Sequence, residues 1–355
     1  MNRRDLLRAG VALSALPFLA RAADPAPKPI KTILVGTGHS HAGGKLAAMR
    51  AQPALFDVVG VVEPDERRRK SAEGRKDYAG LAFLSQEQAL GTTGLEAIAV
   101  EADVAEQVTA AMPFAQAGIH IHLEKPGGAS LPAFRALVGE IRKRERRLQL
   151  GYMFRYNPAF RFAFDAARDG LLGKIYEIHG VIGKTVGPAE RAETAQFGGG
   201  MMFELGCHLI DTVVRLLGVP TKVHAHLRQS QAKPGALADN TLAVLEYPDA
   251  VATIRSAGID VEGGARRQLN VSGNRGAVSI VPLEPPKATL TLAEAKAPYA
   301  KGTQKLDLPP MAGRYTAQMA GFAQMIRSSA APEFDLAHEL SVFEAVLKAS
   351  GMPVE

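Results

Sequence analysis

One short segment carries a lysine that can hold a substrate oxygen. In "HLEKP", Glu124 and Lys125 directly follow an apolar run. A lysine in such a place can donate a hydrogen bond to a substrate hydroxyl and stabilise the charge that develops on its oxygen. An ordinary exposed lysine at the start of a loop is the alternative, and the remainder of the chain has to decide between the two.

A second segment, "GGGMMFELGCHLIDTVVRLLG", predicts a helix with a narrow polar stripe on an otherwise apolar surface. The spacing of Glu204 and His208 suits a hydrogen bond, and a carboxylate that orients an imidazole prepares it to act as a general base. The solvent face of an amphipathic helix has the same pattern, so both interpretations stay open. The stripe runs at positions i, i+4, i+7 and i+11, on Glu204, His208, Asp211 and Arg215.

The stretch "ILVGTGHSHAGG" has the strand, tight turn and helix start that bind the pyrophosphate of a dinucleotide. Gly36 and Gly38 fill the first two positions of G-x-G-x-x-G, whereas the third position holds His41. The start of the following helix favours phosphate charge. The candidate cofactor contacts of this loop are Gly36, Gly38, His39, Ser40 and His41.

His39 and His41 stand two residues apart and invite comparison with metal ligands. The rest of a tetrahedral ligand set is missing from the neighbouring sequence, and no cysteine is near. We therefore expect no metal site, and we expect the two histidines to cap the helix or to line the mouth of the cofactor cleft.

An acid, Glu63, ends the apolar run of "FDVVGVVEPD". A carboxylate in that place can accept hydrogen bonds from both ribose hydroxyls and repel a 2′-phosphate, which favours NAD over NADP. The arginines Arg67, Arg68 and Arg69 keep NADP possible. A surface acid in the turn before Pro64 is the alternative for Glu63.

The elements that must position these residues alternate up to about residue 150. Apolar strands are predicted at "KTILVG", "FDVVGVVEPD", "GLEAIAVEA" and "IHIHLEKP", with helical stretches between them. This pattern predicts an α/β domain, residues 30–150, with a parallel sheet covered by helices on both faces. Lys125 then lies at the carboxyl end of a strand, where ligands bind in such sheets.

The character of the sequence changes after residue 150. Strands follow one another without intervening helices, and "EYPDAVATI" predicts a hairpin, so an antiparallel sheet in an α+β domain is expected over 151–355. The Glu204 helix interrupts this domain. Two further helices, around 313–328 and 336–350, end the chain and can pack back on the first domain.

Together these motifs resemble the Gfo/Idh/MocA family, which includes glucose-fructose oxidoreductase and inositol dehydrogenase. The resemblance rests on the glycine loop, "VVEPD", "HLEKP", "GYMFRYNPAF", "GGGMMFELGCHLID" and the closing helices. It implies a Rossmann domain followed by a domain with an open antiparallel sheet that often serves as an oligomer interface. It also implies NAD or NADP as cofactor and sugars or cyclitols as substrates.

The resemblance implies roles for particular residues as well. The family's lysine and histidine correspond to Lys125 and His208, and Glu204 stands where the family usually has Asp. We expect Glu204 or Asp211 to orient His208, and Glu124 and Lys125 to contact the cofactor. Candidate substrate contacts are Lys125, His208, Arg155 and Tyr156, with packing between the domains as the alternative for the last two.

These observations predict an exported NAD(P)-dependent oxidoreductase that acts on the CH–OH group of a sugar or sugar-like alcohol and holds its cofactor tightly. A glycosidase or lyase that oxidises its substrate only transiently, with no net redox change, is the alternative. A third interpretation is a ligand-binding protein that keeps the fold without turnover.

Charge and composition exclude other classes of protein. The net charge is +6, but the clusters "DERRRK" and "IRKRERR" contain acidic neighbours in helical stretches and indicate solvated helix faces rather than a nucleic-acid surface. No apolar run is long enough to span a bilayer. The partners we expect are a small carbohydrate and further copies of this chain, associated through the C-terminal sheet.

The start of the chain predicts export. Residues 1–23 combine Arg3 and Arg4, a mild apolar run and a small-residue end, which resembles a twin-arginine signal peptide. The mature protein would then lie in the periplasm or outside the cell, without stable membrane insertion. Cys207 is the one cysteine, so no intramolecular disulfide can form.

Overall fold

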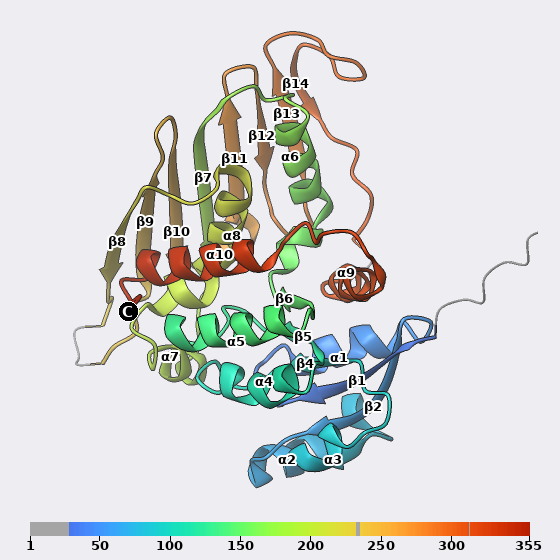
Figure 1. Cartoon of the computed structure of the whole chain (residues 1–355). Helices are drawn as coiled ribbons and strands as arrows, with labels where there is room; N and C mark the ends of the chain where they lie inside the picture. Colours follow the sequence, from blue (N-terminus) through green and yellow to red (C-terminus); the bar gives the residue numbers. More distant parts are fainter. Residues whose placement is uncertain (1–27, 232–234, 312) are drawn as a thin grey trace, which may run out of the picture.

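The computed structural model describes residues 28–231, 235–311 and 313–355, so the predicted signal peptide over residues 1–23 lies outside the described residues. The described chain forms a six-stranded sheet and an eight-stranded sheet, one beside the other (Figure 1). The predicted fold class, a Rossmann domain followed by a domain with an open, mostly antiparallel sheet, is confirmed.

The six-stranded sheet is parallel throughout and has the order β3-β2-β1-β4-β5-β6. Its central strands β1 and β4 are mostly apolar and almost entirely buried, as expected where helices cover both faces. The strand order reverses between β1 and β4, which opens a crevice at their carboxyl ends. The strands are β1 (Ile30–Val35), β2 (Phe56–Val62), β3 (Ala82–Leu84), β4 (Ala97–Val100), β5 (His120–Leu123) and β6 (Leu148–Leu150).

Helices connect these strands and pack on the sheet. Side-chain caps fix several of their starts: Asp65 accepts from the Arg68 amide, and Ser85 accepts from the Gln88 amide. The helices are α1 (Ala42–Arg50), α2 (Glu66–Glu73), α3 (Gln86–Leu90), α4 (Gln107–Gln116) and α5 (Leu131–Lys143), with a short 3-10 turn η1 (Lys76–Tyr78).

The eight-stranded sheet has the order β14-β13-β12-β11-β7-β10-β9-β8. Its neighbours are antiparallel except for β7 and β10, which run parallel. The predicted hairpin through Pro248 and Asp249 joins β9 to β10. The strands are β7 (Ile175–Gly183), β8 (Lys222–Arg228), β9 (Asn240–Glu246), β10 (Val251–Ala257), β11 (Gln268–Gly273), β12 (Gly276–Ile280), β13 (Ala288–Leu292) and β14 (Gly302–Lys305).

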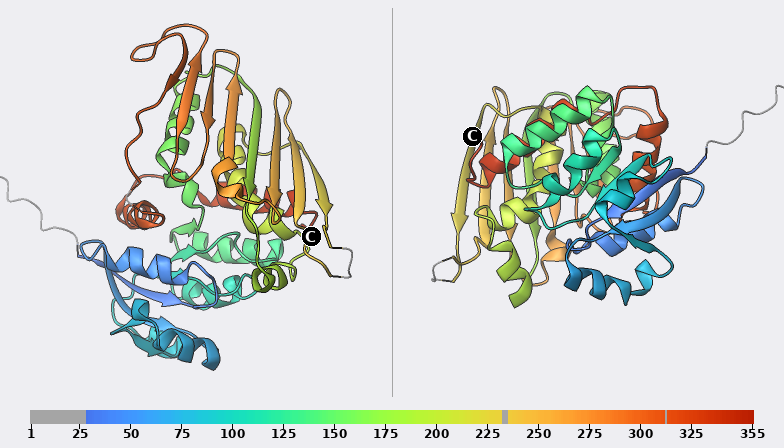
Figure 2. Two further views of the ribbon diagram at one scale, coloured as in Figure 1. Left: turned by 180° about the vertical axis from the view of Figure 1, so that it is seen from behind. Right: turned by 60° about the horizontal axis from the view of Figure 1, so that its bottom comes forward.

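Helices cover one face of this sheet, and the view from behind shows the other face bare (Figure 2). On that sheet Tyr176, Leu242 and Val251 are exposed at 54%, 36% and 44%. The elements of this domain are η2 (Met153–Tyr156), α6 (Pro158–Arg168), α7 (Pro188–Thr194), the π-helical turn η3 (Met202–Gly206), α8 (Cys207–Leu217), η4 (Gly263–Arg266), α9 (Thr316–Arg327) and α10 (Leu336–Ala349).

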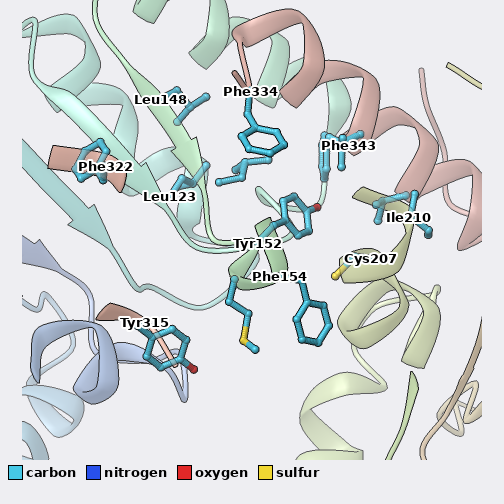
Figure 3. Packing of buried hydrophobic residues seen from close by; sticks show 14 of the residues in the cluster. Leu123, Leu148, Tyr152, Phe154, Cys207, Ile210, Tyr315, Phe322, Phe334 and Phe343 are labelled. Atoms are coloured by element: carbon cyan, nitrogen blue, oxygen red, sulfur yellow. The ribbon is translucent and has the colours of Figure 1, made fainter. Parts of the chain in front are cut away.

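The last two helices join the two sheets. Helix α9 contacts α1, and α10 contacts α5, α8 and β8. Figure 3 shows the shared core that results, with Leu123 and Leu148 of the parallel sheet near Phe334 and Phe343 of the C-terminal segment. Among the described residues, no helix is both long enough and apolar enough to cross a membrane.

Candidate active site

Lys125 lies just past the carboxyl end of β5, and its side chain is 1% exposed. Its ammonium donates to Glu204 Oε1 at 2.7 Å and to the Glu204 main-chain oxygen at 2.9 Å. Burial alone would lower the pKa of Lys125, but the negative charge of Glu204 outweighs it and the pKa is raised. An ammonium has three N–H donors, and the third has no acceptor among the residues that the structure describes, so it can bind a substrate oxygen.

Glu204 lies within the π-helical turn Met202–Gly206, and His208 lies in the α-helix that directly follows it. This wider turn changes the phase of the helix, so residues four apart no longer stack as in a regular α-helix. Glu204 reaches across to Lys125, and no hydrogen bond joins it to His208 in the part of the chain that the structure describes. The prediction that Glu204 orients His208 is therefore wrong.

Asp211 belongs to a buried ion cluster. Arg155, fully buried, donates to Asp211 Oδ1 at 2.7 Å and to Glu339 Oε2 at 2.6 Å, and His338 Nε2 lies 3.2 Å from Asp211 Oδ1. Burial alone would raise the pKa of Asp211, but Arg155 and His338 lower it to about 2. Asp211 therefore orients Arg155 and not His208, which corrects that prediction as well.

The same contacts decide how Arg155 and Tyr156 are used. The Arg155 guanidinium is enclosed between two carboxylates, and the Tyr156 hydroxyl accepts a hydrogen bond from Gln149 Nε2 at 2.6 Å. Both side chains pack where the two sheets meet. These contacts favour the packing alternative, although both residues also line a pocket of about 270 Å³, so their predicted contact with a substrate stays a prediction.

His208 is 4% exposed, and its ring packs against the rings of Tyr152 and Phe154, with centroids 5.8 and 5.4 Å away. Its Nδ1 has no hydrogen-bond partner among the described residues. Burial, and then the charge of Lys125, hold the pKa of His208 well below its usual value. The imidazole is thus neutral, and the solvent-face interpretation of the stripe is wrong.

The glycine loop has the backbone that a dinucleotide requires. Gly36 has φ +85°, and a Cβ there would lie 2.6 Å from the main chain of Ala102. A Cβ on Gly38 would lie 2.3 Å from a carboxylate oxygen of Asp103. Only glycine leaves this cradle open, so the loop fits a pyrophosphate at the start of α1.

The two loop histidines lie at that helix start. His41 is the N-cap residue of α1, and its amide donates to His39 Nδ1 at 3.2 Å, whereas Ser40 is exposed. The His39 ring therefore satisfies one backbone donor at the beginning of the helix. Burial lowers the pKa of His39 to about 3, so this imidazole is neutral.

Glu63 lies in a pocket of about 560 Å³ at the carboxyl ends of β1, β2 and β4, a size that suits an adenosine group. Its carboxylate accepts from the Thr37 amide and hydroxyl, both at 2.7 Å, from the Asp65 amide at 3.0 Å and from Arg68 Nε at 3.3 Å. Glu63 must therefore exchange one of these partners to bind ribose. A second pocket, lined by Thr37, Arg67, Arg68 and Arg75, adjoins it.

A buried group of ionisable side chains escaped the sequence reasoning. Lys45 on α1 is fully buried, and its ammonium lies 2.8 Å from Glu124 Oε2, 2.7 Å from His122 Nε2 and 3.8 Å from Glu101 Oε1. Glu101 directly follows β4, as Glu63 directly follows β2, and this position after a strand could have marked Glu101 as a candidate site residue. No sequence signal marked Lys45 as a site residue, because a lysine in a helical stretch is normally exposed.

Two sets of possible metal donors occur in this region. Glu101, His122 and Glu124 surround a point that the Lys45 ammonium already occupies. The other set consists of His39, His41 and Glu124. Glu124 is the third donor, which the fold brings beside the two histidines and which sequence spacing did not reveal. There, His41 Nδ1 lies 3.1 Å from Glu124 Oε1 and the pair is hydrogen-bonded.

Comparison with known protein families agrees with this geometry. Residues 30–152 match the model of an oxidoreductase family with an NAD-binding Rossmann fold, and residues 160–279 match the GFO/IDH/MocA C-terminal domain. The chain belongs to the Gfo/Idh/MocA family. The family's NAD-binding domain confirms NAD as the predicted cofactor.

Proteins with related sequences include an uncharacterized oxidoreductase of Schizosaccharomyces pombe, 23% identical over 79% of this chain and 78% of that protein. The rhizopine catabolism protein MocA of Rhizobium meliloti is 26% identical over 52% of this chain and 56% of its own length.

Two solved structures share the fold. An Agrobacterium radiobacter oxidoreductase, in complex with NAD⁺, L-tartaric acid and magnesium, has a TM-score of 0.76 at 14% identity, with 91% and 96% of the two chains covered. The UDP-N-acetylglucosamine 3-dehydrogenase GnnA of Acidithiobacillus ferrooxidans has a TM-score of 0.74 at 19% identity, with 91% and 97% covered.

Proposed function

We propose that this Gfo/Idh/MocA protein oxidises an alcohol carbon of a sugar or sugar-like substrate, with NAD as the hydride acceptor. The observation that carries the proposal is the buried Lys125 ammonium at the carboxyl end of β5, which has one N–H without an acceptor in the described part of the chain. That N–H lies where ligands bind in such sheets, beside a domain of an NAD-binding family.

Each group of the chain has a defined task in this reaction. Lys125 donates its third N–H to the substrate oxygen and stabilises the charge that develops there. Glu204 fixes the ammonium, and a neutral imidazole of the cleft takes the hydroxyl proton, for which His208 is the candidate from the sequence. Bound NAD supplies the two-electron acceptor.

The first experiment identifies the cofactor. The purified protein is denatured, and the released nucleotide is identified by mass. NAD(H) or NADP(H) at close to one per chain is expected, and protein without any nucleotide, even after incubation with NAD, would contradict the proposal. The loaded protein is then mixed with a panel of sugars and cyclitols while the absorbance of NADH is followed.

Variants then test the assigned residues. Lys125→Met should lower turnover by about 10²- to 10⁴-fold while retaining the nucleotide, and His208→Asn should do the same if His208, and not another imidazole of the cleft, takes the hydroxyl proton. Lys70→Met, on exposed α2, and His224→Asn, on β8, are matched controls and should turn over like the wild type. Wild-type turnover in either test variant would remove that residue from the mechanism.

A redox-neutral glycosidase or lyase is the second candidate. It is favoured by the number of ionisable groups near Lys125, because elimination and re-reduction need more proton transfers than a single oxidation does. The charge of Lys125 contributes to the pKa shifts of His39, Glu204 and His208, so all three lie near its ammonium. Aryl glycosides distinguish the two functions: this candidate predicts release of the phenol with NAD required but not reduced at equilibrium.

We also propose export and self-association. The twin-arginine pattern of residues 1–23 supports a periplasmic or secreted location, which cell fractionation of wild type and an Arg3→Lys, Arg4→Lys variant would test. The bare face of the eight-stranded sheet (Figure 2) supports an oligomer interface. Leu242 and Val251 are exposed there, since they alternate with the buried Ala243 and Ala252 along β9 and β10. Light scattering of wild type and Leu242→Glu would test it.

A further inference from the structure

The carboxylate–imidazole pair that the sequence led us to expect at Glu204 and His208 occurs at another place. Glu124 Oε1 lies 3.1 Å from His41 Nδ1, with Glu124 fully buried and the His41 side chain 18% exposed. An ionised carboxylate can only accept, so the proton of the neutral imidazole resides on Nδ1. The lone pair is then on Nε2, which forms no hydrogen bond with the described residues and is not buried.

A buried cation keeps Glu124 ionised. Lys45 Nζ lies 2.8 Å from Glu124 Oε2, so the two carboxylate oxygens are divided between Lys45 and His41. Burial alone would raise the pKa of Glu124, but the charge of Lys45, together with the hydrogen bond from His41, holds it well below its usual value. Glu124 is thus a permanent acceptor for the Nδ1 proton.

The His41 ring is held in place from several sides. The centroid of the His39 ring lies 4.5 Å from that of His41, in an edge-on arrangement, and the centroid of Tyr315, which precedes α9, lies 5.4 Å away. The main-chain amide of His41 is also hydrogen-bonded to His39 Nδ1. Glu124 is bonded to the His41 ring, with Lys45 on its other carboxylate oxygen and Arg314 beside Tyr315. Lys125 and Glu204 act on the neighbouring His39 ring, whose Nδ1 lies 4.0 Å from Glu101 Oε2. A fixed ring with one bonded nitrogen and one open nitrogen is the arrangement of an oriented base.

Consecutive residues at the end of β5 organise both halves of the site. Glu124 orients the His41 imidazole, and Lys125 presents its ammonium from the next position along the chain. His208, by contrast, has no carboxylate on either ring nitrogen among the residues that the structure describes.

We infer that His41, oriented by Glu124, is the residue that exchanges the hydroxyl proton of the substrate. The inference rests on the proposed function and assigns one of its steps. The O–H and C–H bonds of the alcohol carbon break and a C=O bond forms. The proton passes to His41 Nε2, and the hydride with both electrons passes to NAD⁺. Glu124 and Lys45 are positioning residues.

His41→Gly is the central test, because it installs the usual third glycine of the dinucleotide loop and leaves a space the size of an imidazole. Turnover should fall by about 10²- to 10⁴-fold, with the bound nucleotide retained, and added imidazole should restore part of it. His41→Asn keeps a donor toward Glu124 but cannot accept a proton, so it should be equally slow and not rescued.

The control is His224→Asn, which breaks a His–Glu pair of the same chemistry at 2.8 Å on the edge strand β8 and should keep full turnover. Glu124→Gln should retain nucleotide and lower turnover at least about tenfold. Unchanged turnover in His41→Gly and His41→Asn overturns the inference. So does loss of nucleotide from His41→Gly, or slow turnover that imidazole does not restore. Wild-type protein that oxidises no alcohol would instead contradict the proposed function itself.

Discussion

Replacing Arg155 by methionine should destabilise the fold without acting through substrate binding. The guanidinium is fully buried and bonded to Asp211 and Glu339 at 2.6–2.7 Å. The pKa of Asp211 falls from 3.8 to about 2, which corresponds to about 2–3 kcal/mol of stabilisation from this carboxylate. Breaking a buried pair and leaving the partner unpaired costs about 3–5 kcal/mol.

This free energy converts into a measurable melting shift. An unfolding entropy of about 2.1 cal/mol/K per residue gives about 0.7 kcal/mol/K for a chain of this size, so Tm should fall by roughly 4–7 °C. Differential scanning calorimetry of Arg155→Met at constant nucleotide loading measures it. Arg161→Met is the control, because Arg161 pairs with Glu333 at the surface and should cost less than about 1 kcal/mol.

The pH dependence sharpens the test. In the wild type the Asp211 contribution is complete above its unfolded pKa and is lost only as pH falls through about 2, so it is constant between pH 5 and 8. In Arg155→Met the carboxylates lose the guanidinium and Asp211 keeps only His338, so their folded pKa values rise and stability declines as pH increases. The gap in Tm should therefore widen from pH 5 to pH 8. An Arg155→Met Tm equal to that of Arg161→Met, together with weaker substrate binding, would refute the packing role.

Three further outcomes follow from the site. Gly36→Ala should abolish nucleotide binding, because φ is +85° and the new Cβ meets the Ala102 main chain at 2.6 Å, whereas the new Cβ of Gly38→Ala meets mainly the movable Asp103 side chain, with the Asp103 main-chain nitrogen 3.3 Å away, and should be milder; equal dissociation constants by fluorescence titration would contradict this. Glu63→Gln removes the charge that disfavours a 2′-phosphate, so NADPH should gain affinity relative to NADH; an unchanged ratio would show that Glu63 does not select the cofactor. Glu204→Gln should cost about 1–3 kcal/mol at pH 7, and the difference in Tm should shrink below about pH 4, because the stability from the lowered pKa of Glu204 is lost as pH falls through it; a pH-independent difference would argue against the ion pair with Lys125.

The sequence predicted the elements and the strand-end residues well, because both depend on local signals. Apolar runs mark the buried strands, and an acid or lysine directly after such a run must lie at the sheet's carboxyl edge, as Glu63 and Lys125 do. The helix that contains His208 was equally visible from its apolar periodicity.

The pairings within the site could not be predicted in this way. A π-helical turn leaves no trace in apolar spacing, so Glu204 was assigned to His208 and in fact binds Lys125. Asp211 pairs with Arg155 and His338, partners that lie 56 and 127 residues away in sequence. Lys45 has the composition of a surface residue, and only the topology shows that it is enclosed by β4 and β5.

The hydrogen bond from the Leu150 amide to Glu339 has a consequence for synthesis of the chain. Leu150 ends the last strand of the parallel sheet, and its acceptor is encoded 189 residues later. A ribosome that adds about 5–20 residues per second needs roughly 10–40 s to make that acceptor. The Leu150 amide at the edge of the nucleotide-binding sheet therefore finds its acceptor only after nearly the whole second domain has emerged, and in the nascent chain this amide lacks the Glu339 carboxylate until then.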